Sequence, residues 1–375
     1  MSKLTRHVLD QSGSGVTMSV TEMCFGSGST VVYCQAALHA DECPPLLVAR
    51  QLCQQLAVLE AQNRLHAEFR VVTQANPIGG QQWVRQHHVG RVELGTGQNF
   101  NRDFPNVAAF VVEEIQHRLT VDPVTNRAIA RELWHEALAG LIPEHPVMAL
   151  QRTLLQRAVD ADWVFDLHSD DEAECHLYAT PGDMAVALSL GGRLGATAVL
   201  VEADTGAQSF DDTLMQCWAT LDAAFPNRGF QSPLTAMTVE LRGTRDVSVA
   251  LAQSDCEALL GLWSEHGLVT YDSGQLLTEP VAYPLRGMDV LTTPYCGLLV
   301  WRRSLGDLVT AGDLLAEIIE PDQPERDPRQ IRARSEGRLI ARRGHPWVRA
   351  GDVVCKVAGS KPLSWRFGNL IGGRQ

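Results

Sequence analysis

Lysine is nearly absent from this chain, and its scarcity is the first constraint on function. The 32 basic residues include only three lysines, Lys3, Lys356 and Lys361, so arginine supplies almost all of the positive charge. Catalysis through a lysine Schiff base deep in the fold therefore has almost no candidate residue. Acidic residues are in excess, and the net charge of −12 argues against nucleic acid or an anionic membrane as a partner.

Paired cysteines and long apolar runs are also lacking. The nine cysteines are odd in number, scattered and never spaced Cys-x-x-Cys, so neither a disulfide framework nor a cysteine-rich zinc site is indicated. The N-terminus has no apolar signal core, and the most apolar later run, residues 184–201, is interrupted by Gly191, Gly192 and Arg193. We therefore expect a cytoplasmic protein without membrane spans.

A strand that ends in polar residues provides the first chemical signal. The apolar residues Val31 to Tyr33 predict a strand that ends before His39 and Glu42, and a helical pattern over residues 46–62 follows. The spacing H-x-x-E lets an imidazole nitrogen and a carboxylate converge in a turn, which is half of a zinc site. In isolation, the pair is better explained as two polar residues of a solvated loop.

A second predicted strand ends in the same way. The apolar residues Trp163 to Phe165 run directly into an Asp-Leu-His sequence that ends at His168. Because open α/β sheets bind their ligands beyond the carboxyl ends of the strands, His168 can supply the third ligand of the zinc site. His176 and Tyr178 follow within ten residues and could line the same pocket, but we leave them unassigned.

The glycine-rich segment between these strands, residues 78–105, is polar and has no clear period. Loops this long inside compact domains are usually functional or disordered. Asn101 and Arg102 stand near its end, and Arg91 lies ten residues upstream. An arginine fork with a neighbouring asparagine can bind a carboxylate, although a single arginine is more often simply solvated.

Glu240 lies in a strand of alternating character. Met237, Val239 and Leu241 share one face, and Glu240 points away from them. The glutamate is either a solvated outward residue or a general base. The flanking Arg242 is consistent with both interpretations.

Four motifs in order resemble one known family, that of succinylglutamate desuccinylase and aspartoacylase, within the wider group of zinc carboxypeptidase-like hydrolases. They are H-x-x-E after a strand, N-P followed by N-R-D-F-P, D-L-H-S, and T-V-E-L-R-G, over roughly residues 30–245. Each motif is common alone, but four in this order are specific. The resemblance implies an α/β fold with a mixed, eight-stranded type of sheet flanked by helices. It also implies one zinc per chain and hydrolysis of an amide whose amine part is a small amino acid.

By this resemblance, His39, Glu42 and His168 are the metal ligands, and a water takes the fourth position. Zinc lowers the pKa of such a water from about 15.7 to near 7. The first motif departs from the family in one respect, since Ala40 stands where glycine is usual after the histidine. If that turn needs positive φ, the site is strained or altered.

The resemblance also implies catalytic and substrate-binding roles. Glu240 would take the proton of the water and pass it to the departing amine. Asn101 and Arg102 match the pair that holds the carboxylate of the substrate. Arg91 is a less certain match, rather than Arg85, to the arginine that stabilises the oxyanion with zinc.

The C-terminal region changes to short strands and turns and contains a repeat. GLLVWRR from Gly297 and VTAGDLL from Val309 recur as GRLIARR from Gly337 and VRAGDVV from Val348, with offsets of forty and thirty-nine residues. Two such halves resemble the barrel-sandwich fold of biotinyl and lipoyl carrier domains. No carrier function follows, because residues 320–336 between the halves contain no lysine. We interpret this region as a structural cap or an oligomer contact.

We therefore expect a zinc hydrolase domain over residues 1–272 and a β-rich barrel-sandwich domain over residues 273–375. The predicted function is removal of the acyl group from a small-molecule N-acyl amino acid, in a protein that is a candidate homo-oligomer. A zinc carboxypeptidase acting on short peptides is the alternative, since it would use the same zinc and glutamate. A non-catalytic binding protein ranks third, because it should lack a metal-binding residue or the general base Glu240, and this chain has all of them.

Overall fold

The computed structural model describes residues 3–10, 13–231, 233–272 and 278–371. By its internal contacts the chain divides into two parts, and each contains segments that are distant in sequence. The first part consists of Met1–His168, Gln208–Thr238 and Val247–Gly274. The second part consists of Ser169–Ala207, Val239–Asp246 and Gln275–Gln375.

The first part is built on one run of hydrogen-bonded strands. In order across the sheet they are β1 (Lys3–Val8), β2 (Ser19–Phe25), β4 (Glu68–Val72), β3 (Val31–Ala36), β7 (Trp163–Asp170) and β11 (Thr235–Gly243). β2 is antiparallel to both of its neighbours, whereas β3 is parallel to β4 and to β7. The carboxyl ends of β3 and β7 therefore lie at the same edge of the sheet.

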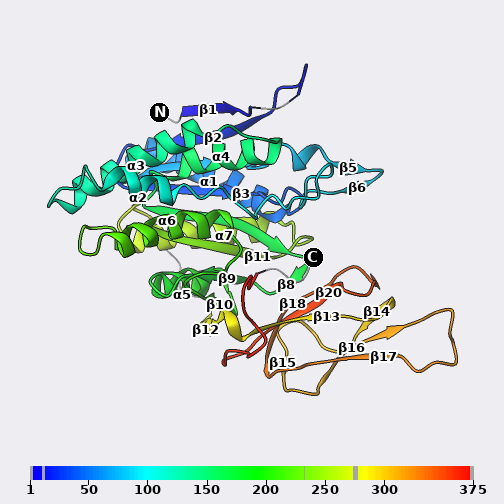
Figure 1. The fold of residues 1–375 in the computed structure, drawn as a ribbon. Helices are drawn as coiled ribbons and strands as arrows, with labels where there is room; N and C mark the ends of the chain where they lie inside the picture. The colour runs from blue at the N-terminus through cyan, green and yellow to red at the C-terminus, as the bar shows by residue number, and fades with distance from the viewer. Residues whose placement is uncertain (1–2, 11–12, 232, 273–277, 372–375) are drawn as a thin grey trace. The chain divides into compact units, whose positions relative to one another are not determined.

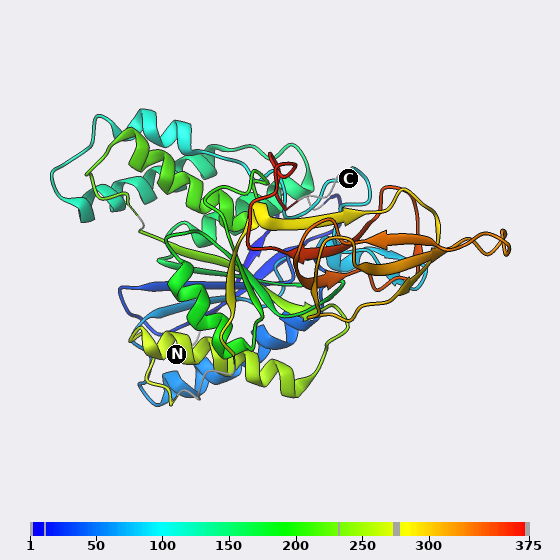
Figure 2. The same ribbon diagram turned by 90° about the horizontal axis from the view of Figure 1, so that it is seen from below.

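Helices cover both faces of these strands (Figures 1 and 2). On one face are α1 (Pro44–Ala61) and α7 (Val249–Glu265), where Trp263 contacts Phe69 and Phe165. The other face carries α2 (Ala108–Ile115), α3 (Pro123–Gly140), α4 (Pro146–Ala158) and α6 (Phe210–Ala224). No helix in the described ranges is both long and apolar enough to cross a membrane.

Successive side chains of β3 point to opposite faces of the sheet, so the strand packs against both helical layers. Tyr33 belongs to the apolar cluster formed with α3, α4 and α6, while its neighbours Val32 and Cys34 are buried from the opposite face. Proline at the first turn begins α1, α3 and α4, where a missing N–H costs nothing. α3 starts at Pro123, where the Asp122 carboxylate accepts hydrogen bonds from the N–H groups of Val124 and Thr125.

The long polar segment is less irregular than its composition suggests. It contains the short helix η1 (Gly79–Gln81) and a two-stranded hairpin, β5 (Trp83–Val84) with β6 (His87–His88). A bridge between Val92 and Asn99 closes the following loop. These contacts fix the segment that carries the predicted arginines.

The second part continues the α/β pattern. Its strand order is β11, β9 (His176–Ala179), β10 (Ala198–Val201) and β12 (Val281–Pro284), with β10 parallel to both neighbours and helix α5 (Met184–Leu194) packed against β9 and β10. The expected class, a mixed sheet flanked by helices, is confirmed. In the described chain this sheet has nine strands rather than eight.

The rest of the second part consists of two antiparallel sheets around one apolar core. One sheet has the order β13 (Met288–Thr292), β20 (Val353–Ala358), β18 (Gly337–Arg342) and β15 (Leu308–Val309), and β8 (Glu172–Ala173) also pairs with β18. The other has the order β17 (Arg329–Arg332), β16 (Leu314–Ile319), β14 (Gly297–Trp301) and β19 (Trp347–Val348).

The two halves of the repeat are interlocked in these sheets. β15 of the first half pairs with β18 of the second, and β19 of the second half pairs with β14 of the first. The valines that begin the two A-G-D segments, Val309 and Val348, are both buried in the shared core. The predicted domain boundary at residue 273 lies outside the described residues, and that division stays a prediction.

Candidate metal centre

His39, Glu42 and His168 converge in the first part. One ligand atom from each lies within 4.8 Å of the others, and all three residues are buried. Ala36 of β3 is paired with Leu167 of β7, so the turn after β3 and His168, the next residue of β7, lie at the same edge of the sheet. The three residues form a group that can hold a metal ion.

The turn that carries His39 and Glu42 depends on close backbone packing. Ala40 donates its N–H to the Gly90 carbonyl over 3.0 Å, and a Cβ added to Gly90 would lie 2.2 Å from the Asp41 nitrogen. Glycine is therefore required at position 90 rather than at position 40. The residue with left-handed backbone in this turn is Ala37, with φ of 57°, and not Ala40.

The outer ring nitrogens of both histidines are held by oxygen acceptors. His39 Nε2 donates to Asn99 Oδ1 over 2.9 Å, and His168 Nε2 lies 2.9 Å from Asp166 Oδ2. An amide oxygen only accepts, and Asn99 Oδ1 also takes the N–H of Asn101, so the proton of His39 belongs on Nε2. Such outer contacts orient metal-binding imidazoles and fix their tautomer.

The inner nitrogens of the two rings both face the Glu42 carboxylate. His39 Nδ1 is 2.9 Å from Oε1, and His168 Nδ1 is 2.8 Å from Oε2. Two imidazole lone pairs and a carboxylate in one buried place form a donor set that zinc accepts. The residues present therefore fit the metal that the sequence predicts.

Burial and charge favour the protonation states that metal binding needs at Glu42 and His39. Burial, with help from the Arg91 cation, lowers the pKa of His39 to about 4. Burial acts to raise the pKa of Glu42, but the two histidines outweigh it and hold that pKa well below its usual range. At His168, burial acts to lower the pKa, but the charges of Asp166 and Glu42 outweigh it and raise the pKa well above its usual value. A divalent cation competes with the proton of His168 for the same site.

Arg91 reaches this group and Arg85 does not. Arg91 Nη1 lies 3.2 Å from Glu42 Oε1 and 3.3 Å from His39 Nδ1, while 52% of its side chain stays exposed. Arg85 occupies the tight turn between β5 and β6, with φ of 57°, and is exposed. Of the two arginines considered, Arg91 can therefore serve both the metal group and an incoming molecule.

Asn101 is buried and its amide contacts several groups of the protein. Its Nδ2 lies 3.2 Å from His168 Nε2, and its Oδ1 accepts the N–H of Phe210 over 2.9 Å. Arg102 donates to the carbonyl of Asn101 through Nη1. Because His168 Nε2 faces the Asp166 acceptor, Asn101 Nδ2 packs beside the ring and donates to Asp166 Oδ2 over 3.5 Å. This contact is not part of the predicted role of Asn101 in binding a carboxylate.

Glu240 lies on β11 in the second part, on the alternate face from Val239 and Leu241, as expected. Its electrostatic neighbours within that part are Tyr178 and Lys356. His176, left unassigned by the sequence, is buried, donates from Nδ1 to the Glu174 carbonyl, and has a pKa lowered by burial to about 4.

Sequence reasoning missed Asn99 and Asp166 as contacts of the two histidines. The signal for Asp166 was present, since residues two apart on a strand share a face and Asp166 precedes His168 by two. Asn99 had no comparable signal, because its contact with His39 depends on the path of the loop.

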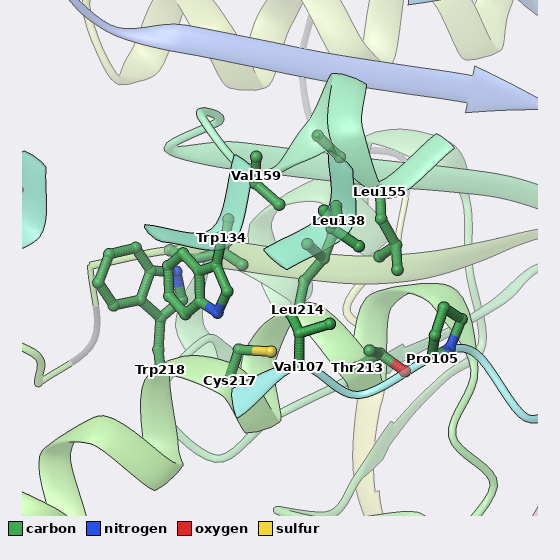
Figure 3. Close-up of a pocket in the computed structure, with 12 residues that line it drawn as sticks. Pro105, Val107, Trp134, Leu138, Leu155, Val159, Thr213, Leu214, Cys217 and Trp218 are labelled. Carbon is green, nitrogen blue, oxygen red and sulfur yellow. The ribbon is translucent and has the colours of Figure 1, made fainter. Parts of the chain in front are cut away.

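The first part also contains an apolar hollow, shown in Figure 3. Its walls come from α3, α4, α6 and nearby loops: Pro105, Val107, Trp134, Leu138, Leu155, Ala158, Val159, Thr213, Leu214, Cys217, Trp218 and Leu234. The free volume is about 10 Å³, which is room for about one water molecule. This hollow is packing space in the core and is too small for a substrate.

Comparisons with known proteins support the resemblance that the motifs indicate. Residues 29–137 match the model of the Succinylglutamate desuccinylase/Aspartoacylase catalytic domain, a class of hydrolases. This match includes His39 and Glu42 and confirms the resemblance to that family. Among curated proteins, none matches the chain at a significant level.

Solved structures extend the likeness over nearly the whole chain. Succinylglutamate desuccinylase/aspartoacylase family proteins from Shewanella amazonensis and Shewanella frigidimarina give TM-scores of 0.82 and 0.84, each at 23% identity. The matches cover 96% of this chain in both cases, and 98% and 97% of those chains. The ectoine utilization protein EutE (DoeB) from Ruegeria pomeroyi gives 0.70 at 18% identity, covering 96% of this chain and 95% of that chain. At these identities the structures establish a shared fold.

Proposed function

We propose that this protein is a zinc-dependent amidohydrolase that removes the acyl group from an N-acyl amino acid. The observation that supports this most directly is the buried group of His39, Glu42 and His168. Both inner ring nitrogens face one carboxylate, and both outer nitrogens are held by oxygen acceptors. The names of the matched family, desuccinylase and aspartoacylase, supply the substrate class.

The three side chains would hold one zinc ion per chain. Two imidazoles and one carboxylate form the ligand set of catalytic sites, which keep a further position for water. When bound, zinc supplies an acidified water near neutral pH and a Lewis acid for the amide carbonyl. Asn99 and Asp166 keep the rings oriented for that purpose.

The remaining steps are assigned to side chains of this chain. Glu240 accepts a proton from the attacking water and passes it to the nitrogen as the carbon–nitrogen bond breaks, so that a carboxylic acid and a free amine are released. Arg91, exposed and adjacent to Glu42, donates hydrogen bonds to the oxygen that gains negative charge. Arg102, with Asn101, binds the carboxylate of the amino acid part.

A small panel assay tests this proposal. The zinc-loaded protein should hydrolyse N-acetyl or N-succinyl amino acids faster than dipeptides that carry the same C-terminal amino acid. Faster cleavage of the dipeptides would replace the proposal with a carboxypeptidase activity. Binding of N-acyl amino acids without turnover would indicate a non-catalytic binding protein. The cytoplasmic location and the homo-oligomeric state stay predictions.

A further inference from the structure

The two halves of the C-terminal repeat share one ion pair in equivalent positions. In the first half, Arg303 lies 3.3 Å from Asp313. In the second half, the equivalent residues Arg343 and Asp352 are also 3.3 Å apart. Each aspartate follows the glycine of an A-G-D turn, so this pair is part of the repeated architecture.

A second pair of equivalent positions differs between the halves. In the first half, Arg302, which directly follows β14, donates two hydrogen bonds to Glu317 on the neighbouring strand β16. In the second half, the same positions hold Arg342 and Lys356, on neighbouring strands β18 and β20. Two cations cannot form an ion pair, so each needs an acidic partner from outside the repeat.

Both partners come from the end of β7 and the residues just after it. Arg342 Nε donates to Glu172 Oε2 over 2.8 Å, and Lys356 Nζ donates to Asp170 Oδ2. Between these two acids, the Asp171 carboxylate accepts the N–H of Gly344 over 2.9 Å.

Backbone pairing reinforces these contacts within the second part. Strand β8 lies beside β18 (Figure 1). The two strands are antiparallel, with Ala173 opposite Ala341 and Glu172 opposite Arg342. Three consecutive acidic residues are thus held by the second half of the repeat. Their segment begins two residues after His168, on the same strand, β7.

Lys356 also interacts electrostatically with the predicted general base. Its ammonium is an electrostatic neighbour of Glu240 and of Tyr178. Burial raises the pKa of Tyr178 to about 12, and the Lys356 charge acts against that rise. The side chains of Lys356 and Asp170 are 18% and 21% exposed, so the pair is shielded from most of the solvent. Among only three lysines, this one stands beside the residue that the proposed reaction needs.

We propose that Lys356 is a positioning residue for the hydrolase site. It fixes the strand end after His168 through Asp170 and places a cation beside Glu240, so that the second half of the repeat serves catalysis while the first half does not. This inference rests on the proposed function. The C-terminal region, interpreted above as a structural cap or an oligomer contact, thereby gains a specific role that depends on the charge of Lys356.

The test uses the full chain and a matched control in the first half. Lys356→Met removes the charge and keeps the length of the side chain, whereas Glu317→Gln breaks the equivalent Arg302 pair. Lys356→Met should lower kcat about 10- to 100-fold, with KM changed less than about 3-fold, because small misplacements of reacting groups are costly. Lys356→Arg should recover most of the loss, and Glu317→Gln should stay within about 2-fold of the wild type.

Hydrogen–deuterium exchange of residues 169–173 provides a readout that needs no substrate. Exchange there should become faster in Lys356→Met and stay unchanged in Glu317→Gln.

Asp170→Asn, which leaves Lys356 in place, serves as a second variant if Lys356→Met does not fold. Equal kcat and equal exchange in Lys356→Met and Glu317→Gln would overturn the inference, as would equal losses in Lys356→Met and Lys356→Arg. An inactive wild type would refute the proposed function, whereas the exchange result would still decide whether Lys356 fixes this segment.

Discussion

The candidate metal group and the apolar hollow are both buried in the first part, yet they are built in opposite ways. The hollow gathers large side chains such as Trp134 and Leu214 and leaves room for about one water. The metal group gathers acceptors that face one another, and further polar groups hold them in place. The comparison teaches that in this chain the arrangement of polar atoms, and not the amount of apolar surface, marks the site of chemistry.

The largest effect expected is on turnover, through Glu240. Glu240→Gln keeps the size of the side chain but cannot take a proton, so kcat should fall by about 10²–10⁴-fold. Zinc content should stay at the wild-type level, because Glu240 is not one of the predicted ligands. Steady-state kinetics and metal analysis of the same preparation measure both quantities. Unchanged kcat would remove Glu240 from the mechanism.

A smaller effect is expected from the polar groups behind the ligands. Asp166→Asn removes the charge that His168 Nε2 contacts, and zinc affinity should fall about 10- to 100-fold. Competition with a zinc-binding dye measures the affinity. Asp162→Asn is the control, since that carboxylate lies just before β7 and binds Arg131, so its loss should leave zinc affinity unchanged. Equal affinities in both variants would contradict the role of Asp166.

The apolar hollow should respond only in stability. Leu214 is 5% exposed and lines the hollow, so Leu214→Ala should lower the free energy of unfolding by about 2–4 kcal/mol. Urea denaturation measures this loss, and Val121→Ala, at a residue that is 93% exposed, should change it by less than about 0.5 kcal/mol. At 25 °C the folded variant should keep its zinc and its kcat. Lost zinc binding would show that the two regions are not independent.

The smallest effect concerns a buried ion pair without a catalytic role. Burial acts to raise the pKa of Glu22, but hydrogen bonds from Arg157 outweigh it, and the pKa lies below its ordinary value of 4.5. A lowered folded-state pKa means that the pair stabilises the protein above about pH 4.5 and stops doing so as pH falls through the lowered value. Glu22→Gln should therefore cost about 1–3 kcal/mol at pH 7 and much less at pH 3. Denaturation at both pH values tests this, and an equal cost at both would contradict it.

Much of the metal group could be predicted from local sequence. His39 and His168 each follow an apolar run, and the parallel pairing of β3 with β7 brings these strand ends together. The choice between Arg91 and Arg85 was harder, because it depends on the β5–β6 hairpin and on packing against Gly90. The composition of a polar loop predicts neither the β5–β6 hairpin nor the close backbone packing at Gly90.

Other features were beyond reach because their causes are distant in sequence. β1 was not foreseen, since its exposed, polar residues carry little hydrophobic pattern. The repeat itself was visible, but the partners of Arg342 and Lys356 lie about 170 and 186 residues away. From the sequence alone, the three acidic residues 170–172 cannot be told from a solvated charged loop, because their partners lie far along the chain.

The central claim is that His39, Glu42 and His168 bind one metal ion together. Elemental analysis of purified, dialysed wild type and Glu42→Gln tests it most directly, since the amide removes the carboxylate that both rings face. The account predicts about one zinc per chain in the wild type and less than about a tenth of that in the variant. Equal zinc in both proteins, or none in the wild type after loading, would contradict it.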